Sequence, residues 1–424
     1  MGLGSLNSIP SRNDSNDSYS LVGFIVLTLF VYALIYRPFI SWMFIAPSIR
    51  LGIEGFIICL LVVINLRYRY SEGLLWLISL VVIFGCVLFF HLDTFIKLAS
   101  TINKWVFLTL LIGLFIGNPK ILHTSIKLWK ILFSVLCTMA IIAFVGYKTG
   151  LIPFSPLVLS GNYYFHNPIL GNLIPRRLFG TEFGRVTGFM HEGQYFGFFL
   201  GMNILLAKDW ILDASSRTRF IWINLIAGIF TLSTTFFVFF TLYFLSTCSV
   251  GGKKPDMVLR LMFFSVLGAM VIGLLIGLNY FEQTSASIRI IRFFQNWSYF
   301  LHGDWLSMLL GYGTGIMRVE LGIGFESGWF AILVDHGLIM FLLMASLFAM
   351  LTKHNRWLLF YILLTHFANN MFWSPLFLIL IAMSYAFHRD TLRRVVVPER
   401  LPEALPADGS YSVMPSSEAP KPAL

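Results

Sequence analysis

Apolar segments separated by short polar stretches follow one another along most of the 424-residue chain. Many of them approach the roughly 20 residues that an α-helix needs to cross a bilayer. Windows of high hydropathy predict twelve spans, at 21–36, 51–66, 74–90, 105–117, 127–147, 190–207, 219–232, 234–248, 258–279, 327–351, 357–370 and 374–388. This pattern predicts an all-α, polytopic integral membrane protein.

Two of the apolar runs, 219–248 and 357–388, are interrupted near their middle. The interrupting residues are Ser233-Thr234-Thr235 in the first run and Asn369-Asn370 with Pro375 in the second. Each run is compatible with one long helix or with a hairpin of two shorter helices. A helix of about 15 residues rises only ~22 Å, so the helices of a hairpin would be tilted or partly re-entrant.

Basic residues favour the two hairpins, because Lys and Arg collect in cytoplasmic loops. With hairpins, the basic loops share one side: Arg67 with Arg69, Lys120 with Lys127 and Lys130, Lys208 with Arg217 and Arg219, Lys253-Lys254, and Arg389 with Arg393 and Arg394. Both termini are then cytoplasmic. The chain divides into a cytoplasmic segment 1–20, a transmembrane domain 21–388, and a tail 389–424 whose proline-rich part is predicted to be disordered.

Composition narrows the class further. Only 12% of the residues are charged, against about 25% in soluble domains. The net charge of +10 follows from the basic loops on one side, so nucleic-acid binding is not predicted. All four cysteines fall inside predicted spans and none forms a CxxC pair, so we expect neither a disulfide framework nor a thiolate metal site.

Two long segments, 148–189 and 280–326, lie on the outer side in this topology. Apart from Lys148 at a helix end, their basic residues are all arginines: Arg176, Arg177, Arg185, Arg289, Arg292 and Arg318. The planar guanidinium group binds phosphate or carboxylate oxygens two at a time, which favours an anion site. The alternative is that these arginines reach lipid headgroups or pair with glutamates of the same segments.

The second outer segment has two further features of an anion site. Arg289 and Arg292 are three residues apart, so a helix would place both on one face. Gly311, Gly313 and Gly315 form a run whose backbone N–H groups could approach phosphate oxygens closely. The alternative interpretation of the glycine run is a plain turn.

Ionisable residues also stand at the outer boundaries of two predicted spans. Glu326 directly precedes the span that starts at 327, where a carboxylate can be partly desolvated. Arg185, His191 and Glu192 lie within eight residues where the first outer segment enters a span. Such residues are costly at a membrane boundary, which favours a functional role, although an interfacial salt bridge between Arg185 and Glu192 is the alternative.

Two stretches of this chain resemble a known family. GRVTGFMHEGQYFGFF at 184–199, and GYGTG at 311–315 followed by FESGWFAILVDHGL at 325–338, resemble the paired signatures of the O-antigen polymerase and O-antigen ligase superfamily. The resemblance covers roughly 180–390 and implies a GT-C-like glycosyltransferase of the bacterial inner membrane, acting at the periplasmic face on undecaprenyl-diphosphate-linked glycans. Glu326-Ser327 stands where ligases usually have a His-Asn pair, so the chain is more similar to the polymerases. It departs from the family in lacking a proline after Glu192.

The resemblance implies a role for each residue named above. The arginines that would bind the diphosphate correspond to Arg176 or Arg177, Arg185, Arg289 and Arg292. Glu326 is the first candidate for the general base that activates the acceptor hydroxyl, and His191 or Glu192 is the second. We expect no cofactor and no divalent metal, because guanidinium groups can stabilise the leaving diphosphate and the chain has no Asp-x-Asp pair. A single displacement implies inversion at the anomeric carbon.

The expected activity is polymerisation of lipid-linked oligosaccharide repeat units for O-antigen or another surface polysaccharide. Expected partners are undecaprenyl-diphosphate-linked glycans, membrane lipids, and a chain-length regulator and a flippase of the same pathway. The nearest alternative is a ligase that moves the glycan onto lipid A core or a protein. An alternative of another class is a non-enzymatic flippase or exporter, which would be expected to place its charges along a central cavity.

Overall fold

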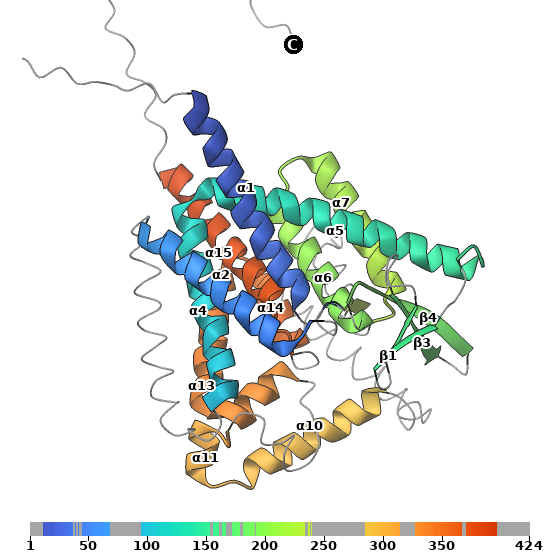
Figure 1. Ribbon diagram of the computed structural model, residues 1–424. Coiled ribbons are helices and arrows are strands. Elements are labelled where there is room, and N and C mark those ends of the chain that lie inside the picture. The colour runs from blue at the N-terminus through green and yellow to red at the C-terminus, as the bar shows by residue number, and fades with distance from the viewer. Residues whose placement is uncertain are drawn as a thin grey trace, which may run out of the picture.

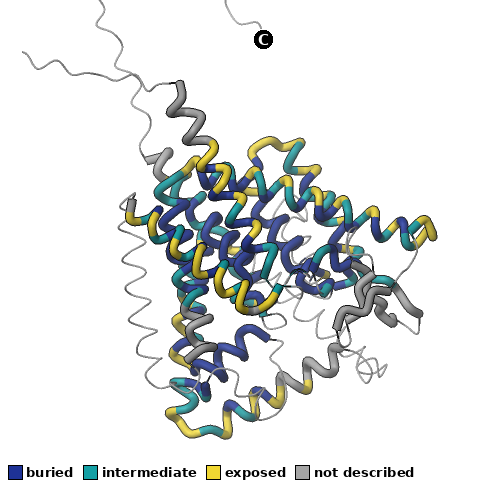
Figure 2. The backbone as a smooth tube through the Cα atoms, in the orientation of Figure 1, coloured by how far each residue is buried: buried dark blue, intermediate teal, exposed yellow. Residues whose placement is uncertain are grey.

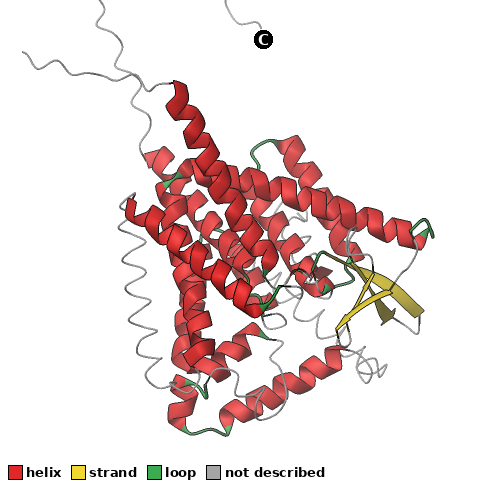
Figure 3. Ribbon diagram, in the orientation of Figure 1, coloured by secondary structure: helices red, strands yellow, loops and turns green. Residues whose placement is uncertain are grey.

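The computed structural model describes residues 12–36, 39, 41, 45–67, 95–152, 156–160, 163–166, 172–178, 181–190, 192–233, 236–237, 239, 285–313, 327–366 and 370–396. This part of the chain is mostly helical (Figure 3). The helices are α1 (Arg12–Ile35), α2 (Pro47–Arg67), α4 (Phe95–Gly117), α5 (Pro119–Lys148), α6 (Gly193–Trp210), α7 (Ala214–Phe230), α10 (Ser285–Leu301), α11 (Trp305–Leu310), α13 (Gly328–Thr352), α14 (Arg356–Thr365) and α15 (Pro375–Val396) (Figure 1).

Three of the described helices are long and apolar enough to cross a membrane: Ser48–Leu66, Pro119–Lys148 and Gly328–Thr352. Shorter apolar helices cover Ser20–Ile35, Asn103–Gly117 and Arg356–Thr365. The predicted spans 74–90 and 258–279, and most of 234–248, lie outside the described residues. The structure therefore gives a mostly helical chain with apolar helices suited to a membrane.

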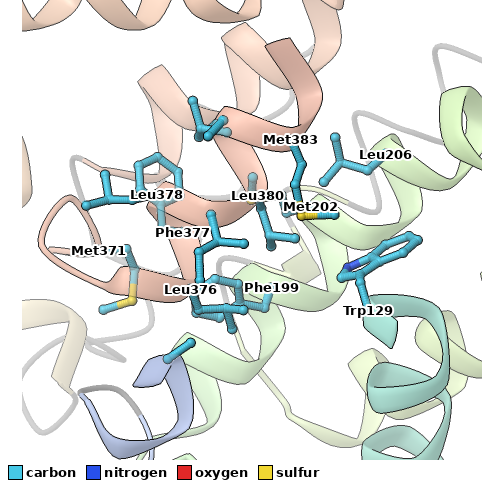
Figure 4. Packing of buried hydrophobic residues seen from close by; sticks show 14 of the residues in the cluster. Trp129, Phe199, Met202, Leu206, Met371, Leu376, Phe377, Leu378, Leu380 and Met383 are labelled. Atoms are coloured by element: carbon cyan, nitrogen blue, oxygen red, sulfur yellow. The ribbon is translucent and has the colours of Figure 1, made fainter. Parts of the chain in front are cut away.

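Two helices, α6 and α15, form the centre of the bundle (Figure 2). Residues 193–207 of α6 and 375–384 of α15 are all buried. Figure 4 shows the packing of their side chains, among them Phe199 and Met202 of α6 and Leu380 of α15. A helix that is apolar all round is stable only when protein or lipid surrounds it, and here protein surrounds both.

The outer helices also carry large apolar side chains on the face turned away from the bundle. α1, α2 and α5 turn large apolar side chains outward, including Leu27, Val63 and Ile131, which are 56%, 62% and 60% exposed. Such contiguous apolar faces are rare on soluble proteins and normal on helices that face lipid tails. Burial inside and apolar exposure outside together fit a membrane-embedded bundle.

Both interrupted apolar runs are divided in the structure. α7 ends at Phe230, and Leu232 has a positive φ of 45°. The chain then folds back, so that the Phe236 ring packs against Gly228 of α7 and the Phe239 ring packs against Gly201 of α6. A Cβ at either glycine would clash with that ring. In the second run, α14 ends at Thr365 and α15 begins at Pro375. Neither run is a single long helix.

Hydrogen bonds and a β-bridge join helix ends at each of the two ends of the bundle. At one end of the bundle Phe39 pairs with Met190, and the Gly328 N–H donates to the His366 carbonyl at 2.8 Å. We call this the hairpin end, because strands of the first outer segment lie there. At the opposite end Asn355 contacts Asp209 at 2.9 Å, and further polar contacts join His123 with Asp390, His354 with Ser384, and Lys130 with Ser216.

The first outer segment departs from the all-α prediction. It contains β1 (Pro156–Ser160), β2 (Tyr163–His166), β3 (Asn172–Leu178) and β4 (Thr181–Gly188). They form two antiparallel two-stranded sheets, β1–β2 and β3–β4. A strand of four to eight residues fills only part of a window long enough to detect a membrane span, so hydropathy alone did not predict these hairpins.

A sharp break divides α13, which the sequence predicts as one continuous span. Gly337 has φ 79° and ψ 176°, a conformation open essentially only to glycine. The rings of Trp329 and Phe341 lie 5.3 Å apart, although twelve residues along a straight helix would separate them by about 18 Å. The first half of α13 therefore folds back at the hairpin end, and residues 338–352 continue along the bundle.

Candidate functional site

The predicted site residues are described to different extents. Arg185, Glu192, Gly311 and Gly313 are described with their side chains or backbone contacts. Arg176 and Arg177 are placed on β3, and Arg289 and Arg292 on α10, as backbone positions only. His191, Gly315 and Glu326 lie outside the described residues.

The β3–β4 hairpin brings two of the predicted arginine positions together. In its register Arg176 stands opposite Phe183, and Ile174 stands opposite Arg185. Directly opposed residues share a face of an antiparallel pair and faces alternate along each strand, so Arg176 and Arg185 occupy diagonal positions of one face. Arg177 occupies the other face, opposite Glu182.

Arg185 lies against the beginning of α6. A Cβ on Gly193 would stand 3.5 Å from Arg185 Cδ, 3.1 Å from the Val186 carbonyl oxygen and 3.0 Å from that of Thr231. This position needs glycine because three chain segments meet there. The half-buried Arg185 thus packs beside the first turn of the central helix.

The first turn of α6 adds a second source of positive potential. Its N-cap is Glu192, in an extended conformation, with no side-chain hydrogen bond that caps the helix. Helix N-termini carry a partial positive charge and expose N–H groups, and a guanidinium group beside them strengthens attraction for an anion. Positive potential from Arg185 and from the helix thus lies at the hairpin end of α6, where the N-cap residue Glu192 adds a carboxylate.

The beginning of α13 fixes the chain next to Glu326. Ser327 caps α13 by accepting a hydrogen bond from the Phe330 N–H at 3.3 Å, and its hydroxyl donates to the His366 carbonyl at 3.2 Å. The ring of His366 is fully buried and stacks on Phe372 at 3.9 Å. The residue after Glu326 is therefore held by α13 and by the turn that follows α14, at the hairpin end.

Gly311 and Gly313 serve backbone packing. The Gly311 N–H donates to the Ser307 carbonyl at 2.8 Å, and the Gly313 N–H donates to the Asp335 carbonyl at 3.1 Å. A Cβ on Gly311 would stand 2.4 Å from the Asp335 carbonyl oxygen. Because both N–H groups already donate within the protein, the predicted role of these two glycines in phosphate binding does not fit this geometry, and the turn interpretation does.

The structure also contains a buried ion pair that the sequence did not predict. Lys104 Nζ lies 2.7 Å from Glu54 Oε1, and both side chains are almost fully buried between α4 and α2. Two tyrosines contact the pair, Tyr32 of α1 and Tyr36, which directly follows α1. The available signal was a single charge in or beside each of two apolar spans, but nothing in the sequence pattern joins two residues that lie 50 positions apart.

Among the described residues, no group of three His, Cys, Asp or Glu side chains is arranged to hold a metal ion. No family model, curated protein or solved structure matches the chain. The fold and site thus define a mostly helical protein with helices able to cross a membrane, and with arginine positions gathered at one end of its bundle.

Proposed function

We propose that the protein is a polysaccharide polymerase of the bacterial inner membrane that joins undecaprenyl-diphosphate-linked repeat units at the periplasmic face. The observation that carries the proposal is the position of Arg185, beside the first turn of the buried helix α6 and on the same hairpin face as Arg176. The proposal also rests on the resemblance of 184–199 and 311–338 to O-antigen polymerases.

The proposed reaction is one displacement at an anomeric carbon. A hydroxyl at the non-reducing end of a lipid-linked repeat unit attacks the anomeric carbon of the growing chain and forms the new glycosidic bond. The bond between the anomeric carbon and the diphosphate oxygen breaks, and the hydroxyl proton passes to Glu326. Undecaprenyl diphosphate leaves, and the configuration of the anomeric carbon is inverted. Arg176 and Arg185, with Arg289 and Arg292 on α10, stabilise the departing charge, so the reaction needs no metal.

The proposed topology has twelve spans in a GT-C-like arrangement, both termini in the cytoplasm and the hairpin end in the periplasm. Its support is the grouping of helix ends. The basic residues Lys130 and Arg219 belong to the opposite end, where Lys130 contacts Ser216 of α7. The positive-inside rule assigns such an end to the cytoplasm.

The experiment is an assay of purified protein in lipid nanodiscs with a lipid-linked repeat unit as its one glycan substrate. We expect a ladder of polymers on a gel. Glu326→Gln should remove the ladder, because it removes the proton acceptor and keeps the shape. Asp390→Asn, which breaks an ion pair at the opposite end, is the matched control and should keep the ladder.

Other outcomes contradict the proposal in distinguishable ways. Transfer of a finished glycan to lipid A core, without a ladder, indicates a ligase. Movement of the lipid-linked glycan across a vesicle membrane, without any new glycosidic bond, indicates a flippase or exporter. A full ladder from Glu326→Gln would move the general base to His191 or Glu192.

A further inference from the structure

Four polar side chains form a closed cluster inside the apolar bundle, and we call Tyr32, Tyr36, Glu54 and Lys104 the Glu54 cluster. Lys104 Nζ donates to Glu54 Oε1 at 2.7 Å and to the Tyr32 hydroxyl at 3.2 Å. The Tyr36 hydroxyl donates to Glu54 Oε2 at 2.5 Å. Lys104 Nζ also lies 4.1 Å from the centre of the Tyr36 ring, a cation–π contact.

The cluster joins α1, α2 and α4 at a buried position, where an unpaired charge would raise the free energy of the folded protein. Glu54 of α2 and Lys104 of α4 are 3% and 4% exposed, Tyr32 belongs to α1, and Tyr36 directly follows α1. A buried pair of this kind is poor evidence of stability, since apolar residues of similar size usually stabilise a fold at least as well. Its retention fits a role in fixing one arrangement of the helices.

A continuous set of contacts leads from the cluster to the candidate site. The Phe39 N–H donates to the Tyr36 carbonyl at 3.0 Å. Phe39 then pairs with Met190 as an isolated antiparallel bridge, and these two side chains are 2% and 0% exposed. Met190 directly precedes His191 and Glu192, and its own N–H donates to the Thr187 carbonyl at 3.1 Å.

We infer that Glu54, Lys104 and Tyr36 are positioning residues for the segment that leads into α6. The ion pair holds the end of α1 through Tyr36, and the end of α1 holds Met190 through Phe39. The cluster thus sets the place of Glu192 relative to Arg185, without touching substrate. The inference rests on the proposed function for its catalytic consequence, while its geometric part stands on the contacts alone.

The geometric part is tested by a cross-link. Residues opposed in an antiparallel bridge have Cα atoms within the range that a disulfide spans, so Phe39→Cys with Met190→Cys should form one on mild oxidation. The linked peptide is quantified by mass spectrometry, and the yield of this double variant is the reference. Adding Glu54→Gln or Lys104→Met should lower the yield at least threefold.

The catalytic part is tested by steady-state kinetics in the otherwise unchanged protein. Tyr36→Phe removes one hydroxyl and keeps the ring, so it should fold; we expect kcat to fall at least fivefold with KM within twofold of wild type. The matched control is Tyr361→Phe, which also removes a buried hydroxyl, one that donates to the Phe198 carbonyl at 2.8 Å. It should lower the melting temperature and leave kcat unchanged.

A rescue experiment separates positioning from a general loss of folding. In the cysteine background, Glu54→Gln should regain most of its lost kcat when the disulfide is formed and lose it again on reduction. If Glu54→Gln fails to fold, the double variant Glu54→Gln with Lys104→Met takes its place, because it leaves no unpaired buried charge.

Each outcome has one interpretation. An unchanged cross-link yield in the Glu54 and Lys104 variants overturns the inference, as does an unchanged kcat in Tyr36→Phe. A fall in kcat equal to that of Tyr361→Phe also overturns it, since a structural role would then suffice. A wild-type protein that makes no polymer contradicts the proposed function, and the cross-link still decides the geometry.

Discussion

Arg185 is the residue at which charge and geometry can be separated by substitution. Lysine keeps the positive charge and loses the planar fork, and a charge-assisted hydrogen bond contributes about 1.5–3 kcal/mol. We expect Arg185→Lys to lower turnover at least about tenfold, the equivalent of 1.4 kcal/mol. Initial rates with the lipid-linked repeat unit measure the effect.

The control for this prediction is Arg217→Lys. Arg217 lies on α7 at the opposite end of the bundle, where we expect positive charge alone to matter. The turnover of the Arg217→Lys variant should equal that of the wild-type protein. Full activity in Arg185→Lys but not in Arg185→Ala would show that Arg185 acts as a point charge, and full activity in both would remove it from the site.

Individual residues show which parts of the candidate site can be predicted from the sequence. Arg185 and Glu192 are predicted as site residues at a membrane boundary, because charges there are costly, and in the structure Arg185 packs beside the beginning of α6 while Glu192 is its N-cap. The sequence left the glycine run open between an anion site and a turn, because it does not show that the Ser307 carbonyl of α11 accepts the Gly311 N–H and the Asp335 carbonyl of α13 accepts the Gly313 N–H. The Glu54–Lys104 pair was missed because helix packing alone brings its members together.

The break in α13 predicts a large effect from a small substitution. Gly337→Ala places a residue with a side chain in a conformation that costs roughly 1–3 kcal/mol, and its Cβ would stand 2.3 Å from the Leu309 carbonyl oxygen. We expect a clear fall in the melting temperature measured in detergent. Gly23→Ala in α1 is the control, because a Cβ there meets nothing within 4 Å, and its melting temperature should be unchanged or slightly higher. A Gly337→Ala protein as stable as wild type would contradict the broken helix.

The turn between α13 and α14 predicts a dependence of stability on pH. Burial, and then the nearby His388, lowers the pKa of His354 from 6.5 to about 4. Between pH 6.5 and 4 the unfolded chain therefore binds a proton at His354 that the folded chain does not, so stability falls as the pH falls through this window. The melting temperature should drop between pH 7.5 and 5.0, and His354→Gln should reduce that drop. The exposed His302→Gln is the control and should keep it.

Helices could be predicted where a long apolar run specifies them, but a break or a strand could not be predicted where tertiary contacts determine the backbone conformation. The helices α2, α5 and α13 overlap the predicted spans 51–66, 127–147 and 327–351, since long apolar runs predict helices directly. The break at Gly337 was not predictable, because apolar residues continue through it and the deciding contact comes from Gly311. The strands β3 and β4 were not predicted either, because short segments leave little signal in a long window.

The whole molecule carries a prediction about orientation. A reporter fused after Ser160 or after Asp304 should register the periplasm, and one fused after Lys254 should register the cytoplasm, because the basic loops set the orientation. Alkaline phosphatase and green fluorescent protein fusions at the same sites provide two opposite signals. A cytoplasmic signal after Ser160 would place the hairpin end, and with it the proposed site, on the wrong side for periplasmic chemistry.

The burial of residues 375–384 of α15 on all sides has a consequence for biosynthesis. α15 is the last of the described helices to leave the ribosome, yet α1, α4, α5, α6 and α13 all pack against it. Chains fold from the N-terminus as they are made, so the earlier helices must wait with their inner faces covered by lipid or by an insertion factor until residues 375–396 arrive. A nascent chain that stalls before this point lacks the helix against which the other five pack, and quality-control proteases of the membrane are expected to degrade it.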